Sequence, residues 1–229
     1  MPQPESALPM LPVLVVSGLG FEAQIAAGEG IVSVCGVGSA SLASRLASVA
    51  AQGCSGILSF GTAGGLAPTL APGDCVLADT IVDGAQHWNS DAAWLNALHS
   101  LLPKARRGAL AGVTQPVISS AAKEHLWKES GALAVDMESH WAVQVAQRYN
   151  VPFAACRVIV DPAQRSLPSS ATAGLQPDGR TAILPVLRAL AAHPGELAAL
   201  LALALDARVA RNSLKRIRAS VGVRFAKPM

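Results

Sequence analysis

Three acidic side chains in this sequence of 229 residues stand directly after apolar runs that are typical of buried strands. Glu22 follows the run LPVLVVS at 11–17, Glu138 follows the run that begins at Leu133, and Asp161 closes the run FAACRVIV. Any one of these acids could simply be a helix cap. Because ligands of open α/β sheets bind beyond the carboxyl ends of the strands, we expect all three to share one cleft. Carboxylates in a cleft suit a reaction that develops positive charge on a sugar and releases a leaving group that needs a proton.

The elements that must position these acids alternate along the chain. Short β-branched runs predict strands at 11–17, 31–35, 57–60, 75–82, 110–113, 133–135 and 153–160. The longer helical spacing predicts helices at 39–52, 92–102, 121–130, 138–149, 181–192 and 195–218. Residues 161–180 are rich in Pro, Ser and Gly without periodicity, which predicts a mobile loop. The alternation predicts a layered α/β domain that spans residues 1–229.

Composition excludes several classes of protein. With 51% hydrophobic and only 14% charged residues, a disordered chain is excluded. The longest apolar stretch, Leu197–Leu205, has nine residues, whereas a membrane-spanning helix needs about 20. Residues 1–10 contain no lysine or arginine, so no secretory signal is expected and the predicted location is the cytoplasm. The four cysteines lack C-x-x-C spacing and the five histidines lack a ligand pattern, so we expect free thiols and no metal.

Positive charge is concentrated at the C-terminal end. Residues 207–229 form a predicted basic helical tail with no acid and seven basic residues: Arg208, Arg211, Lys215, Arg216, Arg218, Arg224 and Lys227. A segment of this kind attracts nucleic acid or anionic lipid, but it is equally typical of a solvated helix end that complements the helix dipole. Both interpretations stay open at this point.

Two glycine-rich segments follow predicted strands. Gly18–Ala23 has the form G-x-G-x-x-A of dinucleotide-binding folds, yet the second strand ends at 35–38 without the acid that would hold a ribose hydroxyl, so no dinucleotide is expected. Gly61–Gly65 lacks the G-K-[ST] of a nucleoside triphosphate loop. The chain also lacks G-x-S-x-G, which argues against an α/β-hydrolase nucleophile.

Several separated motifs resemble the nucleoside phosphorylase and nucleosidase superfamily. They are SFGTAGGL at 59–66, LAPGD at 70–74, AVDME at 134–138 and the segment from Val151 to Asp161. The resemblance covers residues 11–163 and implies a three-layer single domain with a central mixed β-sheet flanked by helices. More narrowly, DMESH at 136–140, DPA at 161–163 and the basic C-terminus resemble the hopanoid-associated phosphorylase branch, which is held to remove adenine from adenosylhopane.

The resemblance implies a role for each acid. Asp161 matches the general acid that protonates or hydrogen-bonds N7 of the departing purine. Glu138, with Met137, matches the pair that packs under the ribose and holds its 2′ and 3′ hydroxyls. Glu22 matches the acid that orients or deprotonates water in hydrolytic members. A glycine-rich segment would close on the nucleophile or ribose through its backbone amides, and it comprises Gly61, Thr62, Ala63 and Gly64.

Departures from the superfamily pattern bear on the chemistry. Phosphorolytic members place an arginine where this sequence has Ser59, and together with Glu22 this favours hydrolysis. Phosphorolysis stays open, with inorganic phosphate as co-substrate and Arg157 as its contact; no other cofactor is expected. The pair Ser139-His140 replaces the usual small residues, which predicts a different wall near the sugar and a different 5′ substituent.

The predicted function is therefore N-glycosidic cleavage of an adenine nucleoside with a large apolar 5′ side, adenosylhopane being preferred. The enzymatic alternatives are a methylthioadenosine or S-adenosylhomocysteine nucleosidase and a purine nucleoside phosphorylase. A non-catalytic purine-binding protein is the alternative of another class, and the three acids argue against it. Expected partners are the nucleoside substrate, an anionic inner-membrane surface bound by the tail, and further copies of the chain, since superfamily members pack as dimers or rings. Nucleic acid is not expected.

Aromatic side chains near the middle of the chain have two interpretations. His87, Trp88 and Trp94 could line the substrate entrance, but core packing and surface anchoring explain them at least as well. None of them is predicted to be catalytic.

Overall fold

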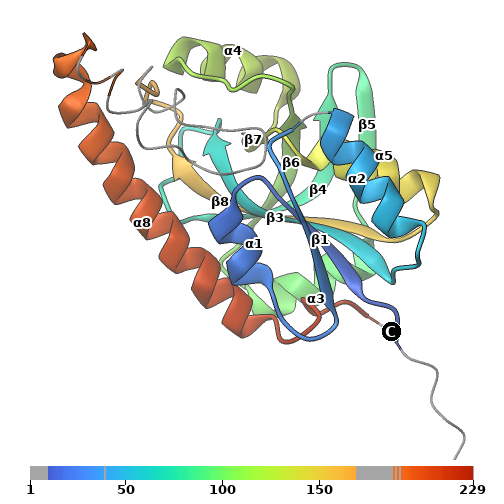
Figure 1. The fold of residues 1–229 in the computed structure, drawn as a ribbon. Helices are drawn as coiled ribbons and strands as arrows, with labels where there is room; N and C mark the ends of the chain where they lie inside the picture. The colour runs from blue at the N-terminus through green and yellow to red at the C-terminus, as the bar shows by residue number, and fades with distance from the viewer. Residues whose placement is uncertain (1–9, 39, 169–187, 189, 191, 229) are drawn as a thin grey trace, which may run out of the picture.

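The predicted alternation of strands and helices is present along the chain (Figure 1). The computed structural model describes residues 10–38, 40–168, 188, 190 and 192–228. The strands are β1 (Val13–Ser17), β2 (Ile31–Cys35), β3 (Gly56–Gly65), β4 (Cys75–Asp83), β5 (Gln86–Asn89), β6 (Arg106–Gly112), β7 (Ala134–Asp136) and β8 (Phe153–Asp161). The helices are α1 (Gly20–Ala26), α2 (Ala40–Ala50), α3 (Ala92–Leu101), α4 (Ser120–Ser130), α5 (Ser139–Arg148) and α8 (Leu197–Ser220), with a short 3-10 turn at Pro194–Glu196.

All eight strands belong to one mixed sheet. Its order is β2-β1-β3-β7-β6-β4-β5, and β8 pairs with both β3 and β4. Five strands thereby form a closed circuit, because β3 pairs with β8, β8 with β4, β4 with β6, β6 with β7, and β7 with β3. The pairings of β3 with β7 and of β4 with β8 are antiparallel. The circuit brings the C-terminal ends of β3, β7 and β8 next to one another.

Helices cover both faces of the sheet, so the molecule has three layers. Alternate residues of each strand point to opposite faces, and in β1 Val13 and Val15 belong to one apolar cluster while Leu14 and Val16 belong to the other. The first cluster packs against α3 and α8, and the second against α2 and α5. This confirms the predicted three-layer α/β domain with a central mixed sheet. None of the described helices is long and apolar enough to cross a membrane.

The glycine-rich segment Gly61–Gly65 is strand, whereas the sequence predicted a turn after residue 60. It forms the second half of β3 and pairs with β8 from Gly61 to Gly64 and with β7 at Gly64 and Gly65. Gly64 is opposite Val135 on one side and Asp161 on the other. The missing side chains allow two neighbouring strands to approach this end of β3 closely.

The basic C-terminal segment is part of the folded core. Ala210, Leu214, Ile217, Val221 and Phe225 are buried in the cluster shared with α3 and β8. The indole Nε1 of Trp94 donates to the carbonyl of Phe225 at 2.7 Å. Trp94 is fully buried, so its interpretation as an entrance residue is wrong and core packing is correct.

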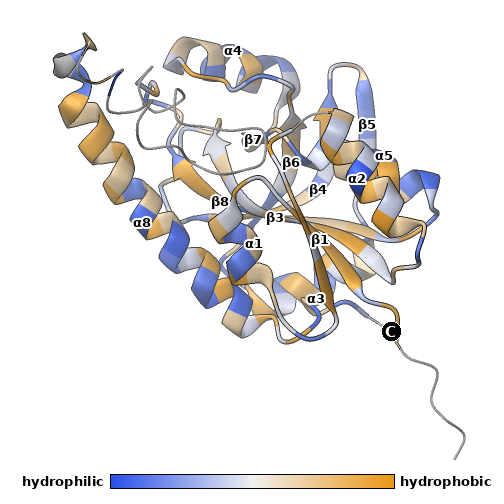
Figure 2. Ribbon diagram, viewed as in Figure 1, coloured by the Kyte–Doolittle hydropathy of each residue, from blue (hydrophilic) through white to orange (hydrophobic). Residues whose placement is uncertain are grey.

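The basic residues of this segment divide into two groups. Arg218 donates to the carbonyl of Ala26, Arg224 to the carbonyl of Leu11, and Lys227 lies over the Trp94 ring. The exposed ones lie on α8: Arg208, Arg211, Lys215 and Arg216. Figure 2 shows α8 as mainly apolar in its first half and mainly polar in its second half.

Other differences from the predicted elements are small. The strand β5 and the short helix α1 were not predicted, because each has few residues and weak periodicity. Most of the predicted loop at 161–180 and of the predicted helix at 181–192 lies outside the described residues. The four cysteines, all among the described residues, are thiols outside any disulfide, as expected, and they are buried or half-buried.

Candidate active site

A cavity of about 180 Å³ lies at the C-terminal ends of β1, β3, β7 and β8. Glu22, Glu138 and Asp161 all line it. Met137 and the β3 residues line it as well, namely Thr62, Ala63 and Gly64. Gly61 does not line the cavity and lies behind it. The structure thus places the three predicted acids together, as expected from strand ends that meet at one edge.

Glu22 is held rigidly at the start of α1. Its Oε2 accepts a hydrogen bond from the backbone N–H of Leu19 at 3.0 Å. Its Oε1 accepts from the backbone N–H of Thr62 at 2.8 Å and from the Thr62 hydroxyl at 2.6 Å. A Cβ at Gly61 would lie 2.5 Å from Glu22 Oε2, so this position requires glycine for the carboxylate to fit. Glu22 therefore ties α1 to β3 and presents a fixed acceptor at the cavity.

Glu138 lies beside Gly18 and Gly38, which follow the C-terminal ends of β1 and β2. The backbone N–H of Gly38 donates to Glu138 Oε1 at 3.1 Å. A Cβ at Gly18 would lie 3.0 Å from the same oxygen, so Gly18 leaves room for a carboxylate rather than for a pyrophosphate. Burial raises the pKa of Glu138 to about 8, and the neighbouring carboxylates of Asp136 and Glu22 add to this, while Arg157 opposes it. Glu138 is thus close to a neutral acid at neutral pH.

Arg157 is buried beneath the cavity and is surrounded by acceptors. Its Nε lies 2.7 Å from Asp136 Oδ2 and its Nη2 lies 3.4 Å from Glu138 Oε2. Nη2 also donates to the Ser59 hydroxyl at 2.5 Å. With 1% of its side chain exposed, Arg157 is not free to bind phosphate as the sequence had suggested. It instead compensates the carboxylates around it, since buried charges are stable only when paired.

Asp161 lines the cavity from the end of β8, which pairs with β3 on the side away from β7 and Glu138. Its Oδ2 accepts from the ammonium of Lys123 on α4. Burial raises the pKa of Asp161 above its ordinary value, and the Lys123 and Arg165 charges oppose that rise. Asp161 thus sits in a dry environment with one adjacent cation, a combination that allows a carboxyl group to hold and release a proton.

The pair Ser139-His140 does not form a wall of the cavity, and this part of the prediction is wrong. The Ser139 hydroxyl donates to Asp136 and lies 2.8 Å from the Ser59 hydroxyl, behind the site. His140 is buried against Gly112, and its ring lies near that of Trp141, with centroids 4.8 Å apart and a tilt of 41° between the planes. Burial lowers the pKa of His140. Both side chains begin α5 and face its packing side rather than the ligand space.

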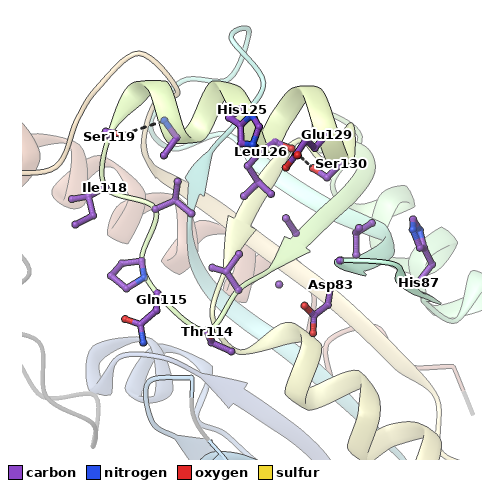
Figure 3. A pocket seen from close by; sticks show the side chains of 18 residues that line it. Asp83, His87, Thr114, Gln115, Ile118, Ser119, His125, Leu126, Glu129 and Ser130 are labelled. Carbon is purple, nitrogen blue, oxygen red and sulfur yellow. Dashed lines mark hydrogen bonds and ion pairs between the residues drawn. The ribbon is translucent and has the colours of Figure 1, made fainter.

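A larger groove of about 970 Å³ borders the cavity. In Figure 3, His125 and Glu129 on α4 border one side of this groove, and Asp83 and His87 border the other. The two spaces share three wall residues: Val113, Pro116 and Val117. His87 therefore lines a groove next to the cavity, while Trp88 packs partly against the core.

Sequence reasoning missed Lys123 and the structural role of Arg157. Lys123 is the buried side chain of α4, and its only sequence signal is that it shares a helical face with Leu126 and Trp127, three and four residues on. Arg157 stands in an apolar strand, where a charged residue signals a buried ion pair. Neither signal reveals which carboxylate is the partner, because the partners come from distant strands.

The charged residues among the described lining of the cavity are all acidic: Glu22, Asp136, Glu138 and Asp161. Such a lining favours a cationic sugar over an anionic ligand. It offers a fixed acceptor for water at Glu22, an acceptor for sugar hydroxyls at Glu138, and a proton donor on the other side at Asp161. The arrangement can therefore separate a sugar from a leaving group by acid and base catalysis.

Solved structures with a similar fold include two nucleosidases and a hydrolase. One is the 5′-methylthioadenosine/S-adenosylhomocysteine nucleosidase of Helicobacter pylori with butyl-thio-DADMe-Immucillin-A. It has a TM-score of 0.64 and 16% identity, and the match covers 92% of this chain and 98% of the nucleosidase. A second similar structure is S-adenosylhomocysteine nucleosidase from Streptococcus pyogenes with 5-methylthiotubericidin. It has a TM-score of 0.62 and 16% identity, and the match covers 92% of this chain and 99% of the nucleosidase. Futalosine hydrolase of Helicobacter pylori has a TM-score of 0.59 and 18% identity, and the match covers 67% of this chain and 89% of the hydrolase. These similarities establish the fold.

Sequence comparison identifies the family. No curated protein sequence matches the chain significantly. The model of the phosphorylase superfamily, however, matches residues 9–192, which is most of the chain. The protein therefore belongs to the phosphorylase superfamily, and the prediction of a nucleoside-cleaving enzyme is confirmed at the level of that superfamily.

Proposed function

We propose that this protein hydrolyses the N-glycosidic bond of an adenine nucleoside. The observation that carries the proposal is that Glu22, Glu138 and Asp161 line one cavity, in which the end of β3 separates β7, which precedes Glu138, from β8, which ends at Asp161. In this arrangement Asp161 gives its proton to N7 of the base as the glycosidic bond breaks. Glu138 accepts hydrogen bonds from the ribose hydroxyls, and Glu22 takes a proton from the water that attacks C1′.

The lining of the cavity supports water rather than phosphate as the nucleophile. Arg157 is buried against Asp136, Glu138 and Ser59. A phosphate ion would approach a lining whose charged residues are all acidic, whereas water can donate to Glu22. Phosphorolysis with inorganic phosphate as co-substrate is the alternative, and it needs a cation that the described lining does not supply.

The preferred substrate is adenosylhopane, in which the nucleoside carries a large apolar 5′ group. The support is the resemblance at 136–140 and 161–163 together with the groove of about 970 Å³ next to the small cavity. Its shared wall of Val113, Pro116 and Val117 is apolar. The alternative substrates are methylthioadenosine and S-adenosylhomocysteine, and the similarity in fold to nucleosidases of these compounds supports them.

The outer face of α8 supports contact with an anionic membrane from the cytoplasmic side. Leu197, Leu201 and Leu205 recur every four residues and are about half exposed or more. The same face continues into Arg208, Lys215 and Arg216. Each basic residue near an anionic surface contributes about 1 kcal/mol to binding. Like other members of its superfamily, the protein is expected to form a homo-oligomer.

Truncation cannot test membrane binding, because removing residues 207–229 would remove Leu214, Ile217 and Phe225 from the core. We instead expect replacement of Arg208, Lys215 and Arg216 by Gln to reduce flotation with phosphatidylserine vesicles at low salt. A variant with the same charge change elsewhere, at the exposed Lys104, Lys128 and Arg148, is the control. Equal flotation of both variants and wild type would remove the membrane proposal.

The function itself is tested by incubating the purified protein with adenosylhopane in detergent, with and without phosphate, and measuring free adenine by chromatography. Phosphate-independent release is expected. The Glu22→Gln variant should lose hydrolysis by about 10²- to 10⁴-fold, the usual contribution of a general base. Strict dependence on phosphate would identify a phosphorylase, and release of adenine only from methylthioadenosine would reassign the substrate. A protein that binds adenosine without cleaving it would be a binding protein.

A further inference from the structure

Lys123 is the most deeply buried charge on α4. The side chain has 0% exposure, although its neighbours along the helix are exposed or half-buried. Lysine is almost never buried completely unless its charge is paired. An ammonium group carries three donors, and here each has an acceptor: Asp161 Oδ2, the carbonyl of Pro162 at 3.0 Å and the carbonyl of Arg165 at 2.9 Å. The site is therefore built for the charged form of Lys123.

The same contacts hold the chain segment that follows β8. Two of the acceptors of Lys123 are backbone carbonyls of residues 162–165. Next to them, the backbone N–H of Ser120 donates to the Ser166 hydroxyl at 3.0 Å, and the N–H of Leu167 donates to the carbonyl of Ile118 at 2.8 Å. Leu167 lines the cavity. The start of α4 thus fixes both Asp161 and the segment that closes the cavity beside it.

The charges that face Asp161 are few. They are Lys123 from α4 and Arg165 from the segment after β8, whereas β3 contributes the backbone of Gly64. Arg165 also forms an ion pair with Asp206 on α8, so part of its charge is compensated elsewhere. Lys123 is therefore the cation that acts most directly on Asp161.

We propose that Lys123 is a positioning residue for Asp161 that fixes its orientation and balances the charge it acquires during the reaction. This inference rests on the proposed function. With Lys123 on Oδ2, Oδ1 is the oxygen left to carry the transferable proton. When the Oδ1–H bond breaks and the proton passes to N7 of the base, the pair of electrons left on Asp161 makes it a carboxylate. Lys123 stabilises that buried anion, and solvent restores the proton after the products leave.

The test compares three variants of the full-length protein. In Lys123→Met, kcat should fall on the order of 10- to 100-fold, part of the usual contribution of a general acid, with a much smaller change in KM. Lys123→Arg keeps the charge and should recover part of the loss. The matched control is Lys128→Met on the same helix, whose exposed partner is Glu124; it should retain wild-type kinetics. Circular dichroism checks the fold, and Lys123→Gln, which keeps two donors, replaces Lys123→Met if the latter does not fold.

A second readout separates this inference from the proposed function. Carbon-13 NMR titration of the Asp161 carboxyl group does not depend on turnover. Loss of the adjacent cation should raise the pKa of Asp161 in Lys123→Met and leave it unchanged in Lys128→Met. In the Asp161→Asn background, Lys123→Met should cause little further loss of kcat, because both act through one group.

Two results would overturn the inference. One is an unchanged pKa of Asp161 in Lys123→Met. The other is an equal loss of kcat on adding Lys123→Met to wild type and to Asp161→Asn, which would show independent action. A wild-type protein that cleaves no nucleoside, but whose Asp161 pKa rises in Lys123→Met, would contradict the proposed function and overturn only the catalytic part of the role of Lys123.

Discussion

The two walls of the cavity handle buried charge differently. On one wall, which we name the Arg157 cluster, a single guanidinium serves the three carboxylates of Glu22, Asp136 and Glu138. On the other wall, which we name the Lys123 pair, one ammonium serves the single carboxylate of Asp161. The first wall has excess negative charge and can stabilise a sugar cation. The second is balanced and can exchange a proton.

The contrast shows that two buried carboxyl groups differ in pKa because their charged neighbours differ. Glu138 has a pKa of about 8 because burial and two nearby carboxylates outweigh the guanidinium. Asp161 is buried to a similar degree, but its pKa rise is opposed directly by its own cation. Environments that differ in this way are how two carboxyl groups in one site take separate roles.

The largest effect is expected from removing the proton donor of the Lys123 pair. Asp161→Asn removes the proton donor of the Lys123 pair with little change of volume, and Asn still offers Lys123 an acceptor oxygen. We expect kcat to fall by about 10²- to 10⁴-fold with the fold intact. Single-turnover adenine release and circular dichroism measure the two quantities. Wild-type turnover would end the assignment of Asp161 as the acid.

The next largest effect, on the free energy of unfolding, is expected from removing the cation of the Arg157 cluster. Arg157→Met leaves three buried carboxylates without their cation, and removing one partner of a buried ion pair typically costs about 3–5 kcal/mol. Urea unfolding should show this loss. The control is Arg107→Met, because Arg107 pairs with Asp79 at 2.6 Å on the surface, where an ion pair contributes at most about 1 kcal/mol. Equal stability of the two variants would contradict the charge-balancing role of Arg157.

A smaller effect concerns substrate binding and pH. If ribose hydroxyls bind the ionised form of Glu138, whose pKa is about 8 in the free protein, the competent fraction falls as the pH drops below 8. We expect KM to rise by up to about tenfold per pH unit below 8. In Glu138→Gln, KM should be higher and independent of pH in this range. A wild-type KM that is constant from pH 6 to pH 8 would reject the role of the carboxylate.

Protonation of Glu138 also affects the thermal stability of the protein. The folded pKa of Glu138 lies above its ordinary value of 4.5, so the folded state binds this proton more tightly than the unfolded state does. The resulting stability is fully present below about pH 4.5 and is lost as the pH rises through 8. The Tm of the wild type should therefore fall between pH 5 and pH 9 more steeply than that of Glu138→Gln. Parallel slopes would contradict the raised pKa.

The sequence by itself determined the elements and the positions of the acids. Hydrophobic periodicity and glycine positions are local properties, so strands such as β2 and helices such as α4 were predicted almost to the residue. An acid after a strand must lie at the C-terminal edge of the sheet, which is why Glu22, Glu138 and Asp161 were expected in one cleft. These inferences need only the chain direction and the period of each element.

Only the tertiary structure decided which charges meet. Lys123 and Asp161 are 38 residues apart, and Arg157 on β8 pairs with Asp136 on β7, although β3 lies between these two strands in the sheet. The burial of the basic C-terminal helix against β8, and of Trp94 beneath it, also arises from contacts between distant segments. Burial and pairing set the proton affinity of a carboxyl group, and both depend on neighbours that the local sequence does not contain.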